Sequence, residues 1–151
     1  MRWDGNLRSN IHWGISLVEL PDKKYSVIYA DPPWYFKNFS KKGEDRNPNQ
    51  HYNCMSIDDI CNLPISHLAD KDCTLLMWVV DPLLQEAFKV IEAWGFKYKT
   101  VGFTWAKSNK TSLGFFTGLG YWTRSNPEMC LLATKGKPQR STRRPKEPSH
   151  W

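Results

Sequence analysis

The sequence predicts a single α/β domain of 151 residues built on a largely parallel sheet. Two observations predict this fold class. Short apolar runs rich in β-branched residues alternate with segments in which apolar residues recur at helical spacing. Two of the apolar runs end in an aspartate followed by proline, at Asp31 and Asp81, as strands do where they enter a turn. With 40% hydrophobic residues the chain can bury one core, and it is short for two domains.

The first half of the chain contains one predicted strand and one predicted helix. The strand covers residues 25–30 (YSVIYA) and is expected to be buried. Residues 36–53 show no periodicity and are long enough to form a functional loop. Ser56 then suits the cap of a short helix, with Asp59 three residues later, and Pro64 is expected to end it.

The second half begins with another predicted strand, over residues 73–80 (CTLLMWVV). Pro82 suits the first turn of a helix, whose apolar residues keep helical spacing from Leu83 to Trp94. Gly95 supplies the left-handed residue that commonly ends a helix.

Two further strands complete the predicted sheet. Residues 96–107 (FKYKTVGFTWAK) predict one strand and residues 128–134 (EMCLLAT) the last, with a loop over 108–120 between them. Because strands alternate with helices, we expect a sheet that is at least partly covered on both faces.

Positive charge collects near the end of the sequence. Residues 135–151 hold six basic residues against one acidic residue, so they supply five of the six net positive charges. This division predicts an α/β domain over residues 1–138 and a basic, disordered tail over 139–151. Such a tail either grips phosphates through counterion release or is simply solvated, and the sequence leaves both interpretations open.

The spacings of the cysteines and histidines fit no compact zinc finger or ribbon, so we predict no metal site. We also predict no disulfides, because the cysteines show no close pairing. No apolar run approaches the roughly 20 residues of a membrane span, and the first ten residues lack the layout of a signal peptide. We therefore expect a cytoplasmic protein that does not enter the membrane. The possible zinc ligands considered are His51, Cys54, Cys61, His67 and Cys73.

The segment from Asp31 to Trp34 (DPPW) is the strongest candidate for chemistry. Ligands of open α/β sheets collect beyond the carboxyl ends of strands, where Asp31 is predicted to lie, although this acid could instead cap a turn. Prolines have no N–H to donate, so Pro32 and Pro33 predict a stiff row of acceptor carbonyls. Trp34 adds a flat face able to stack on a nucleobase, worth about 1–3 kcal/mol.

Acceptors beside a stacking ring suit the exocyclic amine of adenine, which has two N–H donors and a lone pair withdrawn into the ring. If the Asp31 carboxylate and the Pro32 carbonyl each accept one N–H, the lone pair is freed to take a methyl group from S-adenosylmethionine. Orientation alone can supply about 7–11 kcal/mol of such catalysis.

Four segments, in this order, resemble the MT-A-type adenine amino-methyltransferases with a DPPW motif, a family that includes the mRNA adenosine methyltransferase and a phage and bacterial branch. The segments are YSVIYADPPWYFKN, HYNCMSIDDICNLPISHLADKDCTLLMWVVDP, AWGFKYKTVGFTWAK and GLGYWTRSNPEMCLLATKGKP. The resemblance implies a Rossmann-like fold in permuted order, S-adenosylmethionine as cofactor, and transfer to the N6 amine of adenine in DNA rather than RNA.

The resemblance also implies roles for single residues. Asp31, Pro32, Pro33 and Trp34 would form the catalytic motif, and Asp31 and Pro32 would face the cofactor together with Lys135. Several of these residues have a structural alternative: Lys135 could be a solvated turn residue, and Trp122 could lie in the core. The residues implied to contact the substrate are Tyr52, Tyr121, Trp122, Arg124 and Glu128.

The family continues past KGKPQR with a helix, a strand and the residues that hold the cofactor, so this sequence is expected to lack the C-terminal part of the sheet. Two functions therefore stay open: an active methyltransferase, and an inactive relative that keeps nucleic-acid or partner binding, alone or in a homo- or heterodimer. A nucleotide hydrolase matches poorly, because the sequence has no Gly-x4-Gly-Lys-Ser/Thr loop.

Overall fold

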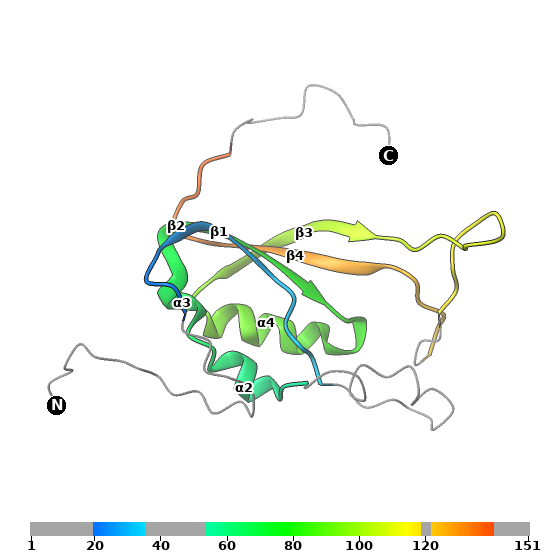
Figure 1. Ribbon diagram of the computed structural model, residues 1–151, viewed down its shortest axis with the longest axis horizontal. Helices are drawn as coiled ribbons and strands as arrows, with labels where there is room; N and C mark the ends of the chain where they lie inside the picture. Colours follow the sequence, from blue (N-terminus) through cyan, green and yellow to red (C-terminus); the bar gives the residue numbers. More distant parts are fainter. Residues whose placement is uncertain (1–19, 36–53, 119–121, 141–151) are drawn as a thin grey trace, which may run out of the picture.

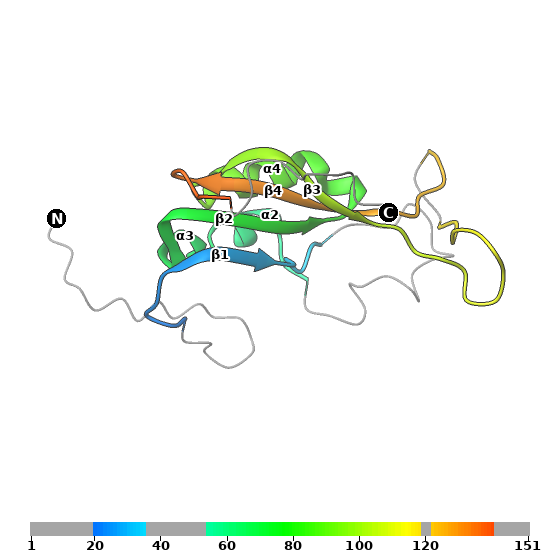
Figure 2. The ribbon, with the colours of Figure 1, turned by 90° about the horizontal axis from the view of Figure 1, so that it is seen from above.

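The computed structural model of the protein describes residues 20–35, 54–118 and 122–140. Within these residues four strands form one sheet in the order β1-β2-β4-β3. Figure 2 shows the strands side by side, with β1 and β3 at the edges. The strands are β1 (Tyr25–Ala30), β2 (Ala69–Val79), β3 (Lys97–Trp105) and β4 (Glu128–Lys135).

The strand directions correct the prediction of a largely parallel sheet. β1 and β2 pair in parallel, but β4 pairs antiparallel with both β2 and β3. Three strands therefore run one way, and β4 lies reversed between β2 and β3. The cause is the connection over residues 106–127, whose described residues contain no helix. Neighbouring parallel strands need a long crossover, usually a helix, whereas antiparallel strands do not.

Local signals placed the helices correctly. The predicted cap at Ser56 is confirmed, because its hydroxyl oxygen accepts the backbone N–H of Asp59 at 3.1 Å. Gly95 has a φ of 81°, which confirms the left-handed residue after the longest helix. Pro64 ends one helix as expected but directly precedes a short second one that the sequence analysis missed. The helices are α2 (Ile57–Cys61), α3 (Ile65–Leu68), the 3-10 turn η2 (Asp81–Leu83) and α4 (Leu84–Ala93).

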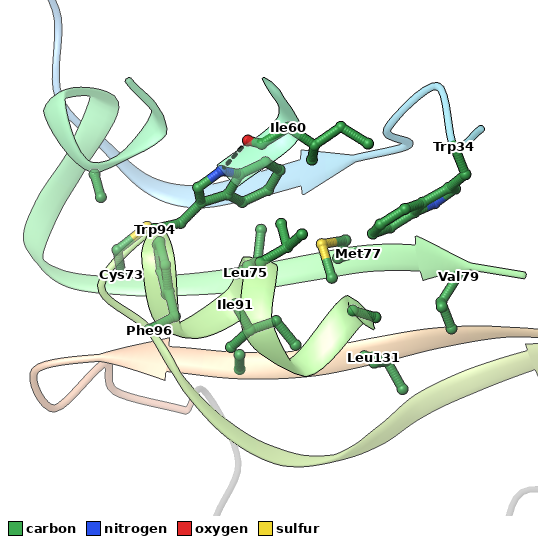
Figure 3. Packing of buried hydrophobic residues seen from close by; sticks show 14 of the residues in the cluster. Trp34, Ile60, Cys73, Leu75, Met77, Val79, Ile91, Trp94, Phe96 and Leu131 are labelled. Atoms are coloured by element: carbon green, nitrogen blue, oxygen red, sulfur yellow. Dashed lines mark hydrogen bonds between the residues drawn. The ribbon is translucent and has the colours of Figure 1, made fainter. Parts of the chain in front are cut away.

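The core lies between the sheet and helices α2 and α4, which share one side of it (Figure 1). From Cys73 to Val79 every second residue of β2 points into this core, and Cys73, Leu75 and Met77 are fully buried. Trp94, at the end of α4, fills the space between the helices, and its indole N–H donates to the Ile60 carbonyl at 2.8 Å (Figure 3). We call this side of the sheet the covered face.

The opposite side carries no helix among the described residues, so the predicted cover of the second face is not found within residues 20–35, 54–118 and 122–140. β1 was expected to be buried, yet Val27 and Tyr29 are 56% and 61% exposed. Trp78 packs edge-on against Phe103, with ring centroids 5.2 Å apart. Monomeric proteins rarely leave large contiguous apolar surfaces open to water. We call this side the bare face, and its apolar side chains include Val27, Tyr29, Leu76, Trp78, Phe103 and Trp105.

Several expected absences concern only the described part of the chain. Within it no helix is long and apolar enough to cross a membrane. No three His, Cys, Asp or Glu side chains there gather as metal ligands. The four cysteines are free, and Cys73 and Cys130 are buried.

Candidate active site at one edge of the sheet

The candidate site forms where four strand termini meet. β1, β2 and β3 end beside one another, and β4 begins there because it runs in the opposite direction. We call this row of strand termini an edge of the sheet, as distinct from the edge strands β1 and β3. Asp31 directly follows β1 and is exposed. Glu128 opens β4 opposite Trp105, the last residue of β3. The reversed strand therefore brings Glu128 to the edge that carries Asp31.

The surroundings of Asp31 disfavour its ionised form. Partial burial raises the pKa of the Asp31 carboxyl above its ordinary value, and the negative charge of Glu128 raises it further. The charge of Asp31 also adds to the effect of burial in raising the pKa of the Cys130 thiol. Cys130 pairs with Trp78, a residue of the bare face. The candidate site thus lies at the border of the bare face.

Glu128 and Asp31 differ in their partners. Glu128 forms an ion pair with the ammonium group of Lys107, the second residue after the end of β3. That ammonium group also lies 5.1 Å from the ring centroid of Trp105. Asp31 makes no salt bridge with any residue in the described ranges. Its carboxylate therefore keeps acceptor oxygens for a ligand.

The turn after Asp31 is held by backbone hydrogen bonds on two sides. The Trp34 N–H donates to the Pro32 carbonyl, and the Met55 N–H donates to the Pro33 carbonyl, both at 2.8 Å. Tyr35 donates in turn to the Met55 carbonyl at 3.2 Å, so residues 33–35 and the segment before α2 form a short parallel bridge. The turn is fixed from within and from the neighbouring chain segment.

These bonds correct the predicted row of free acceptors. The Pro33 carbonyl is engaged by Met55, and the Pro32 carbonyl by Trp34. A carbonyl oxygen has two lone pairs, so the Pro32 oxygen keeps one for a further donor. The Asp31 carboxylate is therefore the exposed acceptor of this turn, whereas Pro32 is a buried residue whose carbonyl keeps one lone pair.

The predicted stacking role of Trp34 is wrong. Its side chain is only 5% exposed and packs in the core near Met77 and Val79 (Figure 3). Its indole N–H donates to the Trp78 carbonyl at 3.1 Å, one residue beyond the last pair between β1 and β2. After Pro33 the chain turns back to the covered face, which removes the ring from solvent. Trp34 therefore anchors the turn that presents Asp31.

Lys135 lies at the opposite edge of the sheet from Asp31. It is the last residue of β4 and pairs with Cys73, near the start of β2. At roughly 3.4 Å per residue, it lies about 24 Å along the strand from Glu128. Its ammonium group donates to the Ser66 carbonyl at 3.4 Å. The structure does not bring Lys135 to the cofactor-facing position beside Asp31, because the strand that carries it is reversed.

The predicted substrate contacts fall into two groups. Trp122 is 99% exposed, which excludes its structural alternative, a place in the core, and Arg124 is exposed beside it. Tyr52 and Tyr121 lie outside the described residues. The structure thus describes Trp122, Arg124 and Glu128 on the same connection between β3 and β4, or at its end.

Sequence reasoning missed Lys107 and Asn126. The Asn126 side chain forms hydrogen bonds with both the N–H and the carbonyl of Lys107. The ammonium group of Lys107 in turn forms an ion pair with Glu128. A signal was present, because Lys107 closes one predicted strand and Glu128 opens the next with the opposite charge. It would have indicated this pair only if the two strands had been expected to be antiparallel.

One hollow close to the candidate site is separate from Asp31. A hollow of about 400 Å³ lies nearby, but it is lined by Asp81, Leu84, Thr104, Pro127 and Met129 and does not include Asp31. Leu84 belongs to α4, so this hollow opens on the side of the helices.

Comparison with known proteins gives a consistent family. The family model described as MT-A70 matches residues 25–149. The Type II methyltransferase M.MunI of Mycoplasma sp is 32% identical over 134 residues, which cover 79% of this chain and 54% of that protein. The N6-adenosine-methyltransferase non-catalytic subunit MTB of Arabidopsis thaliana is 29% identical over 141 residues, 90% of this chain and 17% of that protein.

The N(6)-adenosine-methyltransferase catalytic subunit METTL3 of Homo sapiens is 29% identical over 117 residues, which cover 77% of this chain and 18% of that protein. The chain therefore spans about half the length of the first of these relatives and under a fifth of the other two.

Proposed function

Because this chain belongs to the MT-A70 family, we propose that it transfers a methyl group from S-adenosylmethionine to the N6 amine of adenine in nucleic acid. The observation that carries the proposal is the exposed Asp31 carboxylate, which lies at the carboxyl end of β1 with Glu128 nearby and has no salt bridge to another described residue. An acceptor placed in this way suits an amine substrate. Two of the relatives are named as N6-adenosine methyltransferases or their subunits.

In this proposal Asp31 orients the amine and takes up its proton. One N–H of the adenine amine donates to the carboxylate of Asp31, and the other donates to the remaining lone pair of the Pro32 carbonyl. Both bonds turn the nitrogen lone pair out of the ring plane. The raised pKa of Asp31 makes its carboxylate a better acceptor for the proton that the nitrogen loses on methylation.

The charge of the site suits a cationic cofactor. Asp31 and Glu128 together carry two negative charges and Lys107 carries one positive charge, so one negative charge remains. When bound, S-adenosylmethionine supplies an electrophilic methyl group on a positively charged sulfur. We propose that Asp31 and Pro32 face it, whereas Lys135 lies at the other edge of the sheet.

We propose DNA as the substrate, with RNA as the alternative. Trp122 and Arg124 offer an exposed ring and a positive charge on the connection that ends at Glu128, which suits stacking on a base and contact with phosphate. We also propose that the sheet is Rossmann-like in permuted order and that the chain belongs to the phage and bacterial branch of the family. The protein would act in the cytoplasm, as a monomer or as a homo- or heterodimer.

The test is transfer of isotope-labelled methyl groups to DNA and RNA of the same sequence, followed by digestion and identification of N6-methyladenine. Wild-type protein is expected to label one of the two substrates. Asp31→Ala is expected to lose at least about 100-fold in rate, since positioning supplies most of the catalysis. The matched control is Asp22→Ala, which removes another exposed aspartate before β1 and should keep wild-type activity. If the folded wild-type protein labels neither substrate, the proposal fails.

A second candidate function is nucleic-acid binding without transfer. It is favoured by the relative named as a non-catalytic subunit, which matches 90% of this chain at the same 29% identity as the catalytic subunit. The distinguishing test is fluorescence anisotropy of a labelled oligonucleotide without cofactor, with Trp122→Ala as the variant. Tight, salt-dependent binding combined with no methyl transfer would support this function, and absence of binding would eliminate it.

A further inference from the structure

The connection between β3 and β4 is closed at its base by one side-chain amide. Asn126 accepts the backbone N–H of Lys107 through Oδ1 at 2.6 Å. Its Nδ2 group donates to the Lys107 carbonyl at 2.8 Å and also to the Phe116 carbonyl. An asparagine side chain has two N–H donors and two acceptor lone pairs, so three of the four are used within this connection.

The amide replaces a backbone group that the sheet lacks at this point. The registered pairing of β3 with β4 stops at Trp105 and Glu128. The next residue outward on the β4 side is Pro127, which has no N–H to continue the ladder. The Asn126 side chain instead pairs with both backbone groups of Lys107. Beyond it, Gly118 and Ser125 form an isolated antiparallel bridge.

The same contacts fix the ion pair at the candidate site. Lys107 is held through its backbone by Asn126, while its ammonium group pairs with the Glu128 carboxylate. Glu128 is two residues from Asn126 along the chain. The amide of Asn126 thus holds one partner of the ion pair, Lys107, through two hydrogen bonds, and the other partner follows two residues later in the same chain segment. Glu128 in turn lies close enough to Asp31 for its charge to act there.

We propose that Asn126 is a positioning residue for methyl transfer: its amide closes the base of the connection and thereby holds the Lys107–Glu128 ion pair beside Asp31. This inference rests on the proposed function. Asn126 need not touch adenine or cofactor, because it acts through Lys107 and Glu128. The same clamp fixes where the connection carrying Trp122 leaves the sheet.

The first test does not depend on activity. Amide hydrogen exchange is measured for Asn126→Ala and for Asn109→Ala, a control whose amide makes one 3.3 Å bond to Phe115 within the same connection. Asn126→Ala should accelerate exchange at the Lys107 N–H by at least about tenfold, while β2 and β4 keep wild-type rates. An unchanged rate at Lys107 would overturn the proposal. Faster exchange throughout β2 and β4 would also contradict it, since Asn126 would then serve the whole fold.

The second test uses methyl transfer by folded protein. Asn126→Ala should lower kcat by about 10- to 100-fold with a smaller change in KM, because the reacting groups are misplaced rather than lost. Asn109→Ala should stay within about twofold of wild type. Equal losses in the two variants would show that the amide at 126 has no special role.

Asn126→Asp separates positioning from a general loss of structure. It keeps the acceptor for the Lys107 N–H but places a carboxylate against the carbonyls of Lys107 and Phe116, near the charges of Lys107 and Glu128. Protonation restores one donor, so its activity relative to wild type should rise as pH falls. A ratio that does not change with pH would overturn the inference. If wild type transfers no methyl group, the proposed function fails while the exchange result still decides the clamp.

Discussion

The two faces of the same sheet differ in what covers them and in what they do. On the covered face, side chains such as Leu75 and Met77 are fully buried beneath α2 and α4. On the bare face, Val27 and Tyr29 are more than half exposed. Asp31 and Glu128 lie where that bare face ends. The comparison shows that the covered face holds the fold together, whereas the bare face adjoins the candidate site.

Trp34 links the two sides. It belongs to the motif that carries Asp31, yet its ring lies in the core with the residues of the covered face. The two residues of the motif therefore have different roles: Asp31 is exposed to solvent, and Trp34 anchors the turn in the core. A change in the core can therefore reach the candidate site through Trp34.

The largest expected effect comes from adjacent leucines of β2. Leu75 faces the helices and is fully buried, while Leu76 faces the bare side and is only partly buried. Leu75→Ala should lower the free energy of unfolding by about 2–5 kcal/mol, because it leaves a cavity in the core. Leu76→Ala should cost no more than about 1.5 kcal/mol, since part of its surface already contacts water and the cavity would open to solvent. Urea unfolding of both variants measures the difference. Equal losses would show that the bare face is covered in solution.

A smaller effect is expected at the link between the faces. Trp34→Phe keeps an aromatic ring in the core but removes the N–H that donates to the Trp78 carbonyl. Unfolding should become easier by about 1–3 kcal/mol, the cost of leaving that carbonyl without its partner. If Trp34 instead stacked on substrate, this variant would lose substrate affinity at unchanged stability. Unfolding and substrate binding, measured on the same sample, distinguish the two results.

Substitution of two serines compares how much the helical layer and the edge of the candidate site contribute to stability. Ser56 caps α2, and Ser56→Ala should reduce stability by about 1 kcal/mol. Ser125 donates to an Asp81 oxygen at 2.6 Å, and both residues lie at or near the surface. Ser125→Ala should cost at most about 0.5 kcal/mol, as surface changes usually do. Thermal unfolding of the pair tests this order, and a larger loss at Ser125 would reverse it.

The smallest expected effect is electrostatic. Glu128→Gln removes the nearby negative charge that helps raise the pKa of Asp31. The Asp31 carboxyl should then ionise at lower pH, so the acid limb of the activity profile should move down, by less than about one pH unit for a solvent-exposed pair. The measurement is methyl transfer across a pH series. An acid limb that stays in place, or moves up, would show that Glu128 does not act on Asp31.

Local features were predictable from the sequence, and long-range ones were not. The cap at Ser56, the periodicity of α4 and the left-handed Gly95 each depend on neighbouring residues, and all three are confirmed. The direction of β4 depends on how a connection of some twenty residues folds, which no local pattern encodes. The expectation that Lys135 faces the cofactor came from the family resemblance, and the reversed β4 places this residue at the opposite edge of the sheet from Asp31.

In the candidate site, too, local features were predictable and long-range contacts were not. Asp31 could be placed at a strand end from the run that precedes it, and the structure puts it there. The burial of Trp34 depends on the turn of the chain after Pro33 and on the bridge to Met55, a contact twenty-one positions away. The Lys107–Glu128 pair depends on the reversed direction of β4, which no local pattern encodes.

The central claim is that Asp31 serves chemistry and not the fold, and Asp31→Asn tests it most directly when activity and stability are measured on one sample. Because the folded-state pKa of Asp31 is raised, its ionised form is favoured less in the folded protein than in the unfolded chain, so stability falls as pH rises through that interval. At pH 7 the variant should therefore be at least as stable as wild type, while methyl transfer falls by about 100-fold or more. A variant that unfolds more easily yet still methylates adenine would contradict the account.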